Sequence, residues 1–250
     1  MIKNRNSILI LGAKSKIAKS LSLFYANHNY DLIFAGRNLN RELKDFMTDL
    51  KERYEIEVHA VEFDILDFSS HKKFYDSIPK KPLGVISFIG LTDNQLSGNL
   101  NINDKKTIIN TNFLGIMNLV DIIVDDFIIK NNRGWIMVVS SIAAERGSNR
   151  NNIYACSKSA LNTYLEGKRT SLIFHNIKII TIKLGIANTR MIKGINYPNW
   201  LISEPERIAR LMFVKQQNSI EIAYIPSYWR FIMFIIRNLP RNVYSKIIKD

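Results

Sequence analysis

Tyr154 and Lys158 are the residues whose types and spacing are best suited to chemistry. They stand in a strongly helical segment, where a spacing of four places both side chains on one helix face, one turn apart. A free tyrosine has a pKa of about 10. A lysine ammonium held close favours the phenolate, so the tyrosine can donate and recover a proton near neutral pH. The pair predicts a proton donor and its activator.

Two serines supply a further component of such a site. Ser140 and Ser141 stand at the end of an apolar strand expected at residues 134–140. The carboxyl ends of parallel strands face the ligand crevice of an open α/β sheet. We therefore expect the Ser141 hydroxyl to hydrogen-bond a substrate carbonyl and to stabilise its developing charge. A Tyr-Lys pair alone is most often a pair of surface residues, but its position after this strand favours catalysis.

The turn after the first expected strand has features of a dinucleotide-binding turn. It reads Gly-Ala-Lys-Ser-Lys-Ile-Ala and lies between a strand at 7–11 and a helix at 16–27. Such a turn lets a pyrophosphate approach the backbone at a helix N-terminus, where the helix dipole favours the anion. A single glycine after a strand is often only a turn, but the flanking strand and helix supply the required context. The predicted cofactor contacts are Gly12, Lys14, Ser15 and Ile17.

Charged residues after the second and third expected strands extend this site. Arg37 follows the second strand. At this position an arginine binds the 2′-phosphate of NADP, whereas an acidic residue would bind the ribose hydroxyls of NAD. The alternative for Arg37 is a solvated surface residue. Lys14 is placed to bind the same phosphate. Asp64 either hydrogen-bonds the adenine amino group or caps the strand end together with Asp67. The sequence favours NADPH, with NADH as the alternative.

Short β-branched runs alternate with longer helical patterns along the chain. This alternation predicts a parallel sheet with helices on both faces, a doubly wound Rossmann-type α/β fold of seven strands. The near-continuous apolar strands agree, because parallel strands are buried on both faces. We expect strands at residues 7–11, 31–35, 57–63, 83–89, 134–140, 177–184 and 221–225, and helices at 16–27, 39–53, 104–129 and 152–174, with Asp104 as the N-cap of the third helix.

The composition is that of an ordinary globular protein: of 250 residues, 46% are hydrophobic and 23% charged. We expect one domain at 1–226, with a basic aromatic extension at 227–250 that belongs to it or anchors it at a membrane.

The only cysteine, Cys156, excludes an intrachain disulfide and is expected to be a small packing residue. The first residues do not resemble a leader and no apolar stretch could cross a bilayer, so we expect a cytoplasmic protein. The histidines lack metal-ligand spacing, so we expect no metal.

Taken together, these motifs resemble the short-chain dehydrogenase/reductase family over nearly the whole chain. The resemblance implies a nicotinamide-dependent carbonyl reductase with a catalytic set of Asn112, Ser141, Tyr154 and Lys158. It implies that a water held near the asparagine links the lysine to solvent. It also implies cofactor contacts by Gly90, Tyr154, Lys158, Gly185, Ile186 and Thr189. The chain departs from the family pattern where Lys16 and Ala18 replace glycines, where Ser87-Phe-Ile-Gly90 follows the fourth strand, and where Leu184 replaces a proline.

One subgroup of that family shares several of these departures: the reductases of polyprenyl-phosphate-linked 2-keto-pentoses. The shared features include the atypical turn, the Phe-x-Gly after the fourth strand, and residues 140–146 and 188–191. The resemblance implies a lipid-linked keto-sugar as substrate, a flavin-dependent oxidase as partner and a role in cell-wall polysaccharide synthesis. The alternatives are a soluble carbonyl, such as a 3-oxoacyl thioester or small ketone, and a non-catalytic nucleotide-binding module. No pattern of stacking aromatics in a basic groove predicts nucleic-acid binding.

The C-terminal residues 227–250 mix apolar side chains with cations. The net charge of +13 either favours an anionic partner or reflects the richness in Lys, Asn and Ile of an A/T-biased genome. Segments that mix apolar residues with cations are typical of anchors on an anionic membrane surface. That anchor would place the protein on the inner face of the cytoplasmic membrane, with Trp229 and Phe231 exposed. The alternative is a pair of helices, broken at Pro240, that packs on the core or forms a subunit interface. We expect a homodimer or homotetramer. The cations are Arg230, Arg237, Arg241, Lys246 and Lys249, and the apolar residues include Phe234, Ile235, Tyr244 and Ile248.

Overall fold

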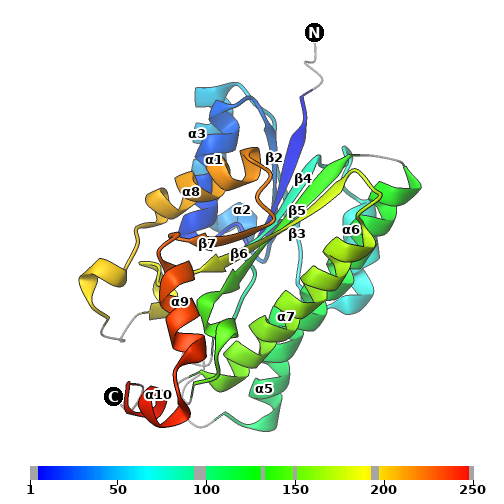
Figure 1. Ribbon diagram of the computed structural model, residues 1–250. Helices are drawn as coiled ribbons and strands as arrows, with labels where there is room; N and C mark the ends of the chain where they lie inside the picture. Colours follow the sequence, from blue (N-terminus) through cyan, green and yellow to red (C-terminus); the bar gives the residue numbers. More distant parts are fainter. Residues whose placement is uncertain (1–4, 93–99, 131–132, 149–150, 193–196, 248–250) are drawn as a thin grey trace.

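The computed structural model describes residues 5–92, 100–130, 133–148, 151–192 and 197–247. Ile248 and Lys249 of the basic aromatic segment lie outside the described residues, as does the side chain of Ile247. The described chain forms one parallel sheet with helices packed on both faces (Figure 1). This arrangement confirms the predicted doubly wound fold.

The sheet has seven strands in the order β3-β2-β1-β4-β5-β6-β7, and all neighbours are parallel. The order reverses between β1 and β4, and ligands of open α/β sheets bind outside the carboxyl ends of the strands at such a point. The strands are β1 Ser7–Leu11, β2 Asp31–Gly36, β3 Val58–Glu62, β4 Gly84–Ser87, β5 Gly134–Ser141, β6 Ile177–Leu184 and β7 Ile222–Ile225. They lie within one or two residues of the predicted bounds.

Two groups of helices cover the two faces (Figure 1). On one face lie α1 Lys16–Asn27, α3 Lys44–Tyr54 and α8 Pro205–Gln217, with the short α2 Leu39–Glu42 beside them. On the other lie α4 His71–Asp76, α5 Ile102–Ile109, α6 Gly115–Ile129 and α7 Asn152–Ser171. Helices α4 and α8 were not among the predicted elements.

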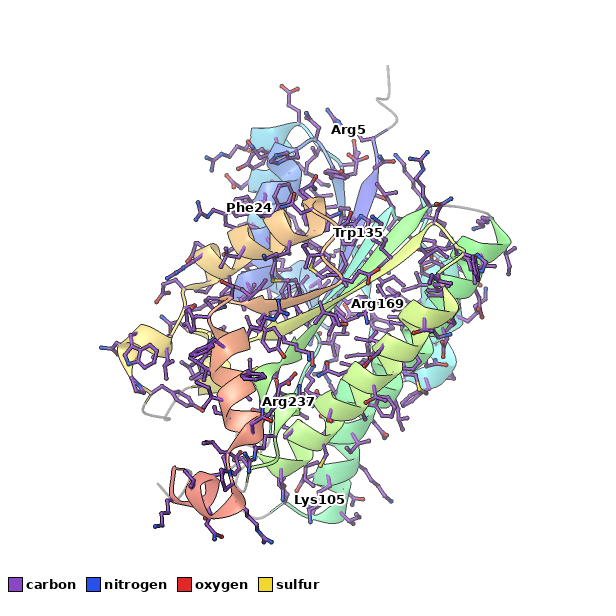
Figure 2. The ribbon with its side chains drawn as sticks, in the orientation of Figure 1. Arg5, Phe24, Lys105, Trp135, Arg169 and Arg237 are labelled. Atoms are coloured by element: carbon purple, nitrogen blue, oxygen red, sulfur yellow. The ribbon has the colours of Figure 1, made fainter. Side chains whose placement is uncertain are left out.

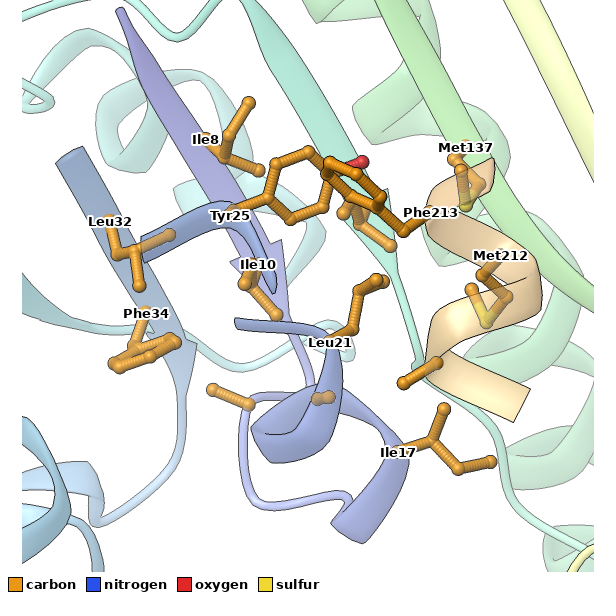
Figure 3. Close-up of a cluster of buried hydrophobic side chains, with 14 of the residues drawn as sticks. Ile8, Ile10, Ile17, Leu21, Tyr25, Leu32, Phe34, Met137, Met212 and Phe213 are labelled. Carbon is orange, nitrogen blue, oxygen red and sulfur yellow. The ribbon is translucent and has the colours of Figure 1, made fainter. Parts of the chain in front are cut away.

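Each face of the sheet has its own apolar core, because successive strand residues point to opposite sides. Ile8 and Ile10 of β1 enter one core, and Leu9 and Leu11 enter the other. Figure 3 shows the first core, where Tyr25 of α1 packs beside Phe213 of α8. Burying one side chain of this size stabilises the fold by about 1.5–3 kcal/mol. The two cores hold the strands whose carboxyl ends carry the site.

Three helix predictions require correction. Residues 39–53 form two helices, because Leu43 leaves helical geometry, and its side chain is buried in the core. The expected helix at 104–129 begins at Ile102, with Asn101 as its N-cap. Asp104 is the third helical residue, and its carboxylate accepts the Asn101 N–H in a capping box. A π-turn at Asn110–Leu114, labelled η3, separates α5 from α6. Helix α7 ends at Ser171 rather than at 174.

The C-terminal segment forms two helices, α9 Trp229–Asn238 and α10 Arg241–Ile247, and the break predicted at Pro240 is confirmed. The expectation that Trp229 is exposed is wrong: its side chain is buried against Gly185, where an added Cβ would lie 2.0 Å from the indole Nε1. Phe231 is exposed, as predicted. None of the helices that the structure describes is long and apolar enough to pass through a bilayer.

Candidate active site

Lys158 is a buried cation at the carboxyl edge of the sheet. Its side chain extends from α7, and its ammonium donates to the carbonyl oxygens of Val139 at 3.0 Å and Ile89 at 3.4 Å. These carbonyls belong to β5 and to the chain just after β4. Burial lowers the pKa of Lys158 from 10.5 to about 8, because the charged form loses water. The lysine can therefore change its protonation state close to physiological pH.

Tyr154 lies one helical turn before Lys158, and its side chain is 8% exposed. The spacing that the sequence predicted is therefore built on one helix, at the edge where β4 and β5 end. Ser157, between the two residues, donates its hydroxyl to the Tyr154 carbonyl oxygen at 2.7 Å. That bond lies within the first turns of α7, the helix that carries both Tyr154 and Lys158.

Asn112 lies in the π-turn η3 and is fully buried. Its Oδ1 accepts the Leu91 N–H at 2.7 Å, and its Nδ2 donates to the Leu91 carbonyl at 2.8 Å and to Ser157 Oγ at 2.9 Å. Asn112 thus joins the chain after β4 to α7. Single-turn π-bulges are frequent at functional sites. The water that the family resemblance implies near Asn112 stays a prediction.

Ser141 is the last residue of β5. Its Oγ accepts the Ala143 N–H at 3.1 Å, within the 3₁₀ turn η4 Ile142–Glu145 that follows. Because the oxygen accepts this N–H, the hydroxyl hydrogen is directed away from Ala143. Two residues earlier in the same strand, the Val139 carbonyl holds Lys158. The end of β5 therefore positions both the predicted hydroxyl and the predicted cation.

Gly90 marks the point where these groups converge. A Cβ at this position would lie 3.5 Å from Lys158 Nζ, 3.7 Å from Asn112 Oδ1 and 3.6 Å from Met191 Cε. The structure thus brings Asn112, Lys158 and Gly90 together, with Met191 of the 3₁₀ turn η5 Arg190–Ile192 beside them. Sequence reasoning missed Met191, because nothing in its local pattern indicates that η5 approaches this site.

The turn between β1 and α1 fits the pyrophosphate of a dinucleotide. Gly12 has φ +74°, and an added Cβ would lie 3.1 Å from the Phe88 carbonyl carbon. This position therefore requires glycine on two grounds. In the part of the chain that the structure describes, the Ser15 side chain accepts none of the N–H groups that open α1. Those N–H groups and the helix dipole suit an anion. Ser15 and Ile17 stand at the start of this helix, as predicted.

Both cations predicted to bind a phosphate have carboxylate neighbours. Arg37 lies 3.6 Å from Asp64, and Lys14 donates to Glu42 Oε1 at 2.8 Å. That hydrogen bond from Lys14 is the main cause of a lowered pKa for Glu42. Asp64 also accepts the Leu66 N–H at 3.0 Å, which agrees with a capping role at the strand end. Glu42 was not predicted, because Lys14 and Glu42 meet only through the fold.

The segment after β6 carries the remaining predicted cofactor residues. Gly185 donates its N–H to the Ile225 carbonyl at 2.8 Å, and Ile186 accepts the Ser203 N–H at 2.9 Å. Thr189 Oγ1 accepts the Met191 N–H at 3.4 Å, so this residue connects the segment to η5. The backbone after β6 is thus held on both sides, beside the site that contains Met191.

The histidines and Cys156, which were assigned no chemical role, differ in their burial. His28, His59 and His175 are exposed, and His71 is fully buried, with Nε2 at 3.0 Å from the Ile65 carbonyl and Nδ1 at 2.9 Å from Asn118 Nδ2. Cys156 is exposed on α7, so its expected packing role is wrong. Among the described residues, no group of three or more His, Cys, Asp or Glu side chains is arranged to hold a metal.

Comparisons with known proteins agree with this geometry. The family profile described as short chain dehydrogenase matches residues 6–199. An NADP-dependent 3-hydroxy acid dehydrogenase of Schizosaccharomyces pombe is 32% identical over 190 residues, which cover 73% of this chain and 72% of the relative. An uncharacterized oxidoreductase of Mycobacterium tuberculosis is 25% identical over 244 residues and 96% of both chains.

Solved structures share the fold. A short chain dehydrogenase from Burkholderia cenocepacia, crystallised in complex with NADP, superposes with a TM-score of 0.79 at 18% identity and covers 98% of both chains. A 3-oxoacyl-[acyl-carrier protein] reductase from Brucella melitensis gives a TM-score of 0.75 at 17% identity, covering 89% of this chain and 90% of its own. The matched family profile spans most of the chain, including β1 to β6 and all four predicted catalytic residues, so this protein belongs to the short-chain dehydrogenase family of oxidoreductases.

Proposed function

We propose that this protein is an NADPH-dependent reductase of a carbonyl group. The observation that carries the proposal is the buried Lys158, whose pKa of about 8 lies within reach of physiological pH, one turn after Tyr154. When bound, the reduced nicotinamide supplies the hydride that adds to the carbonyl carbon. Tyr154 donates its phenolic proton to the carbonyl oxygen, so the C=O bond becomes a hydroxyl-bearing carbon.

Each residue of the site has a defined task in this proposal. Ser141 donates a hydrogen bond to the carbonyl oxygen while negative charge develops there. The charged Lys158 favours the phenolate of Tyr154 and so lowers the cost of proton donation. Asn112 holds α7 and the chain after β4 at a fixed separation through its bonds to Ser157 and Leu91. A steady-state assay tests the proposal: wild type should oxidise NADPH when 2,3-butanedione, an activated diketone, is added.

NADPH is the proposed cofactor, with NADH as the weaker alternative. Arg37 and Lys14 supply positive charge beside the β1–α1 turn, where the phosphates of a dinucleotide bind. Both side chains are partly exposed, so a phosphate can reach them. The relative from Schizosaccharomyces pombe is named as NADP-dependent. Tighter binding of NADPH than of NADH, measured by fluorescence titration, supports this proposal. Equal affinity would contradict it.

For the substrate, we propose the 2-keto group of a polyprenyl-phosphate-linked pentose, presented at an anionic membrane surface by a flavin-dependent oxidase partner. The support for the membrane surface is the outer face of α9. Phe231 is 69% exposed and Phe234 67% exposed, and Ile235 lies on the same face. Arg230, near the start of α9, and Arg241, the first residue of α10, are both exposed. Each cation near an anionic leaflet contributes about 1 kcal/mol.

Vesicle co-sedimentation tests the membrane part of this proposal. Wild type should pellet with phosphatidylglycerol vesicles and stay in the supernatant with phosphatidylcholine vesicles. The double variant Phe231→Ser/Phe234→Ser should lose binding, whereas Phe174→Ser should bind like wild type. Phe174 is 96% exposed in the turn after α7, so it matches the residue type and exposure at a different place. The proposal is contradicted if all three proteins pellet equally with phosphatidylglycerol vesicles, or if none of them pellets.

The relative from Schizosaccharomyces pombe favours a second candidate substrate, a small 3-hydroxy acid or its 3-oxo form. That substrate would need no lipid surface. The two candidates are separated by assaying NADP-dependent oxidation of 3-hydroxybutanoate beside reduction of a short-chain prenyl-phosphate 2-keto-pentose. The expected homodimer or homotetramer stays a prediction, which light scattering in solution tests.

A further inference from the structure

Glu145 ties together three elements at the carboxyl edge of the sheet. It ends the turn η4, four residues after Ser141, and its side chain is 4% exposed. Its Oε1 lies 2.5 Å from the ammonium of Lys183 on β6, and its Oε2 lies 3.1 Å from Arg237 Nη1 on α9. A buried carboxylate is costly unless it is paired, so these two cations hold it in place.

The next residues extend this connection to the C-terminal helices. Arg146 Nη1 donates to the carbonyl oxygen of Ile236 in α9 and, at 2.9 Å, to that of Leu239, the C-cap of this helix. The Arg146 guanidinium lies 3.8 Å from the centre of the Tyr244 ring on α10. The Tyr244 hydroxyl in turn donates to the Gly147 carbonyl at 2.9 Å. The segment after Ser141 is therefore bound to residues more than 90 positions away in the chain.

Helix α9 also contacts the other side of the site. At its first residue, Trp229 packs on Gly185, which begins the segment with the predicted nicotinamide contacts. Near its other end, Arg237, which is labelled in Figure 2, pairs with Glu145 in the turn that follows Ser141. One helix thus touches both the segment that follows β5 and the segment that follows β6. The matched family profile ends at residue 199, before α9 begins.

We propose that Glu145 is a positioning residue for reduction, held by Lys183 and Arg237, and that it fixes the direction of the Ser141 hydroxyl. The link is short, because Ser141 Oγ accepts the N–H of Ala143 and this N–H lies in the same turn as Glu145. When Glu145 moves, the turn and the accepted N–H move with it. Hydrogen bonds aimed at developing charge are effective only when their geometry is preset, and a misplacement of about 1 Å can cost about 10²-fold in rate.

A kinetic comparison tests this role, which rests on the proposed reductase activity. Arg237 is partly exposed, and its removal leaves Glu145 paired with Lys183, so Arg237→Gln should fold. We expect Arg237→Gln to lower kcat for 2,3-butanedione about tenfold, with the KM for NADPH within about twofold of wild type. Arg237→Lys retains the charge and should recover most of the loss. Arg210→Gln, an exposed arginine on α8, should match wild type.

Hydrogen–deuterium exchange measures the same connection without any turnover. In Arg237→Gln, amides of residues 142–147 should exchange faster than in wild type, and in Arg210→Gln they should not. Faster exchange with unchanged kcat would overturn the positioning role. So would unchanged exchange in this segment, or a loss in kcat that Arg237→Lys fails to recover. If wild type itself reduces no carbonyl, the proposed function fails, while the exchange result still reports on the connection.

Discussion

The ammonium of Lys158 donates to the carbonyl oxygen of Val139 at 3.0 Å, two residues before Ser141 in the same strand. This contact joins the two parts of the site, because α7 supplies the lysine and the tyrosine while β5 supplies the serine. Burial makes the lysine a weaker base than usual. Its protonation state therefore changes in a pH range in which the enzyme can be assayed.

The first prediction concerns the pH dependence of reduction. With a pKa of about 8, Lys158 is charged below that pH and neutral above it. Only the charged form favours the Tyr154 phenolate, so kcat/KM for carbonyl reduction should hold steady below about pH 8 and fall above it. A pH–rate profile checks this. The control is Lys158→Met, whose profile should lack the fall in kcat/KM above about pH 8. A wild-type rate that keeps rising above pH 8 would argue against this role of the lysine.

The same lowered pKa predicts how stability changes with pH. The pKa of Lys158 falls from 10.5 in the unfolded chain to about 8 in the folded protein. Between these values the unfolded chain binds more protons, so the contribution of Lys158 to the unfolding free energy rises with pH. Denaturant unfolding measures the unfolding free energy of wild type and of Lys158→Met. The difference between the two proteins should therefore change between about pH 8 and pH 10.5. A constant difference would mean that the lysine is not desolvated.

A third prediction concerns cofactor preference. Arg37→Ala removes a cation placed to bind the 2′-phosphate, which NADH lacks. A hydrogen bond to a charged group contributes about 1.5–3 kcal/mol, so affinity for NADPH should fall roughly 10- to 100-fold. Affinity for NADH should stay within about twofold. Titration of both cofactors into both proteins measures the ratio of NADPH affinity to NADH affinity. Equal losses of affinity for the two cofactors would show that Arg37 does not bind the 2′-phosphate.

Glu42 leads to a prediction in the opposite direction. Its carboxylate accepts a hydrogen bond from Lys14 at 2.8 Å and thus competes with a bound phosphate for that ammonium. Glu42→Gln should strengthen NADPH binding modestly, roughly threefold, because exposed ion pairs are weak. NADH binding should not change. Isothermal titration calorimetry of the variant tests this, and weaker NADPH binding would show that Glu42 supports the site instead.

Much of this structure could be predicted from local patterns. Parallel strands are buried on both faces, so their apolar runs stand out in the sequence, and β6 matches its expected bounds. The Tyr154–Lys158 spacing has a direct geometric meaning on a helix. Gly12 could be assigned because a tight turn between a strand and a helix restricts the residue type. These features depend on short stretches of chain.

Other features arise only when distant segments meet. The partners of Glu145 lie 38 and 92 residues away, and no local pattern indicates them. Trp229 was expected to be exposed because arginines and aromatics surround it, yet a glycine at 185 leaves room for its ring. The π-turn at Asn112 likewise follows from tertiary contacts, since the bonds to Leu91 and Ser157 draw this residue inward. Tertiary packing determines each of these features.

The substitution Tyr154→Phe tests the central claim most directly, because it removes one oxygen atom and leaves the ring in place. NADPH oxidation with 2,3-butanedione should fall about 10²- to 10⁴-fold, the usual contribution of a general acid. NADPH should still bind with an affinity within about twofold of wild type, measured by fluorescence titration on the same preparation. A variant that binds NADPH normally and still reduces the diketone at the wild-type rate would contradict the assignment of Tyr154 as proton donor.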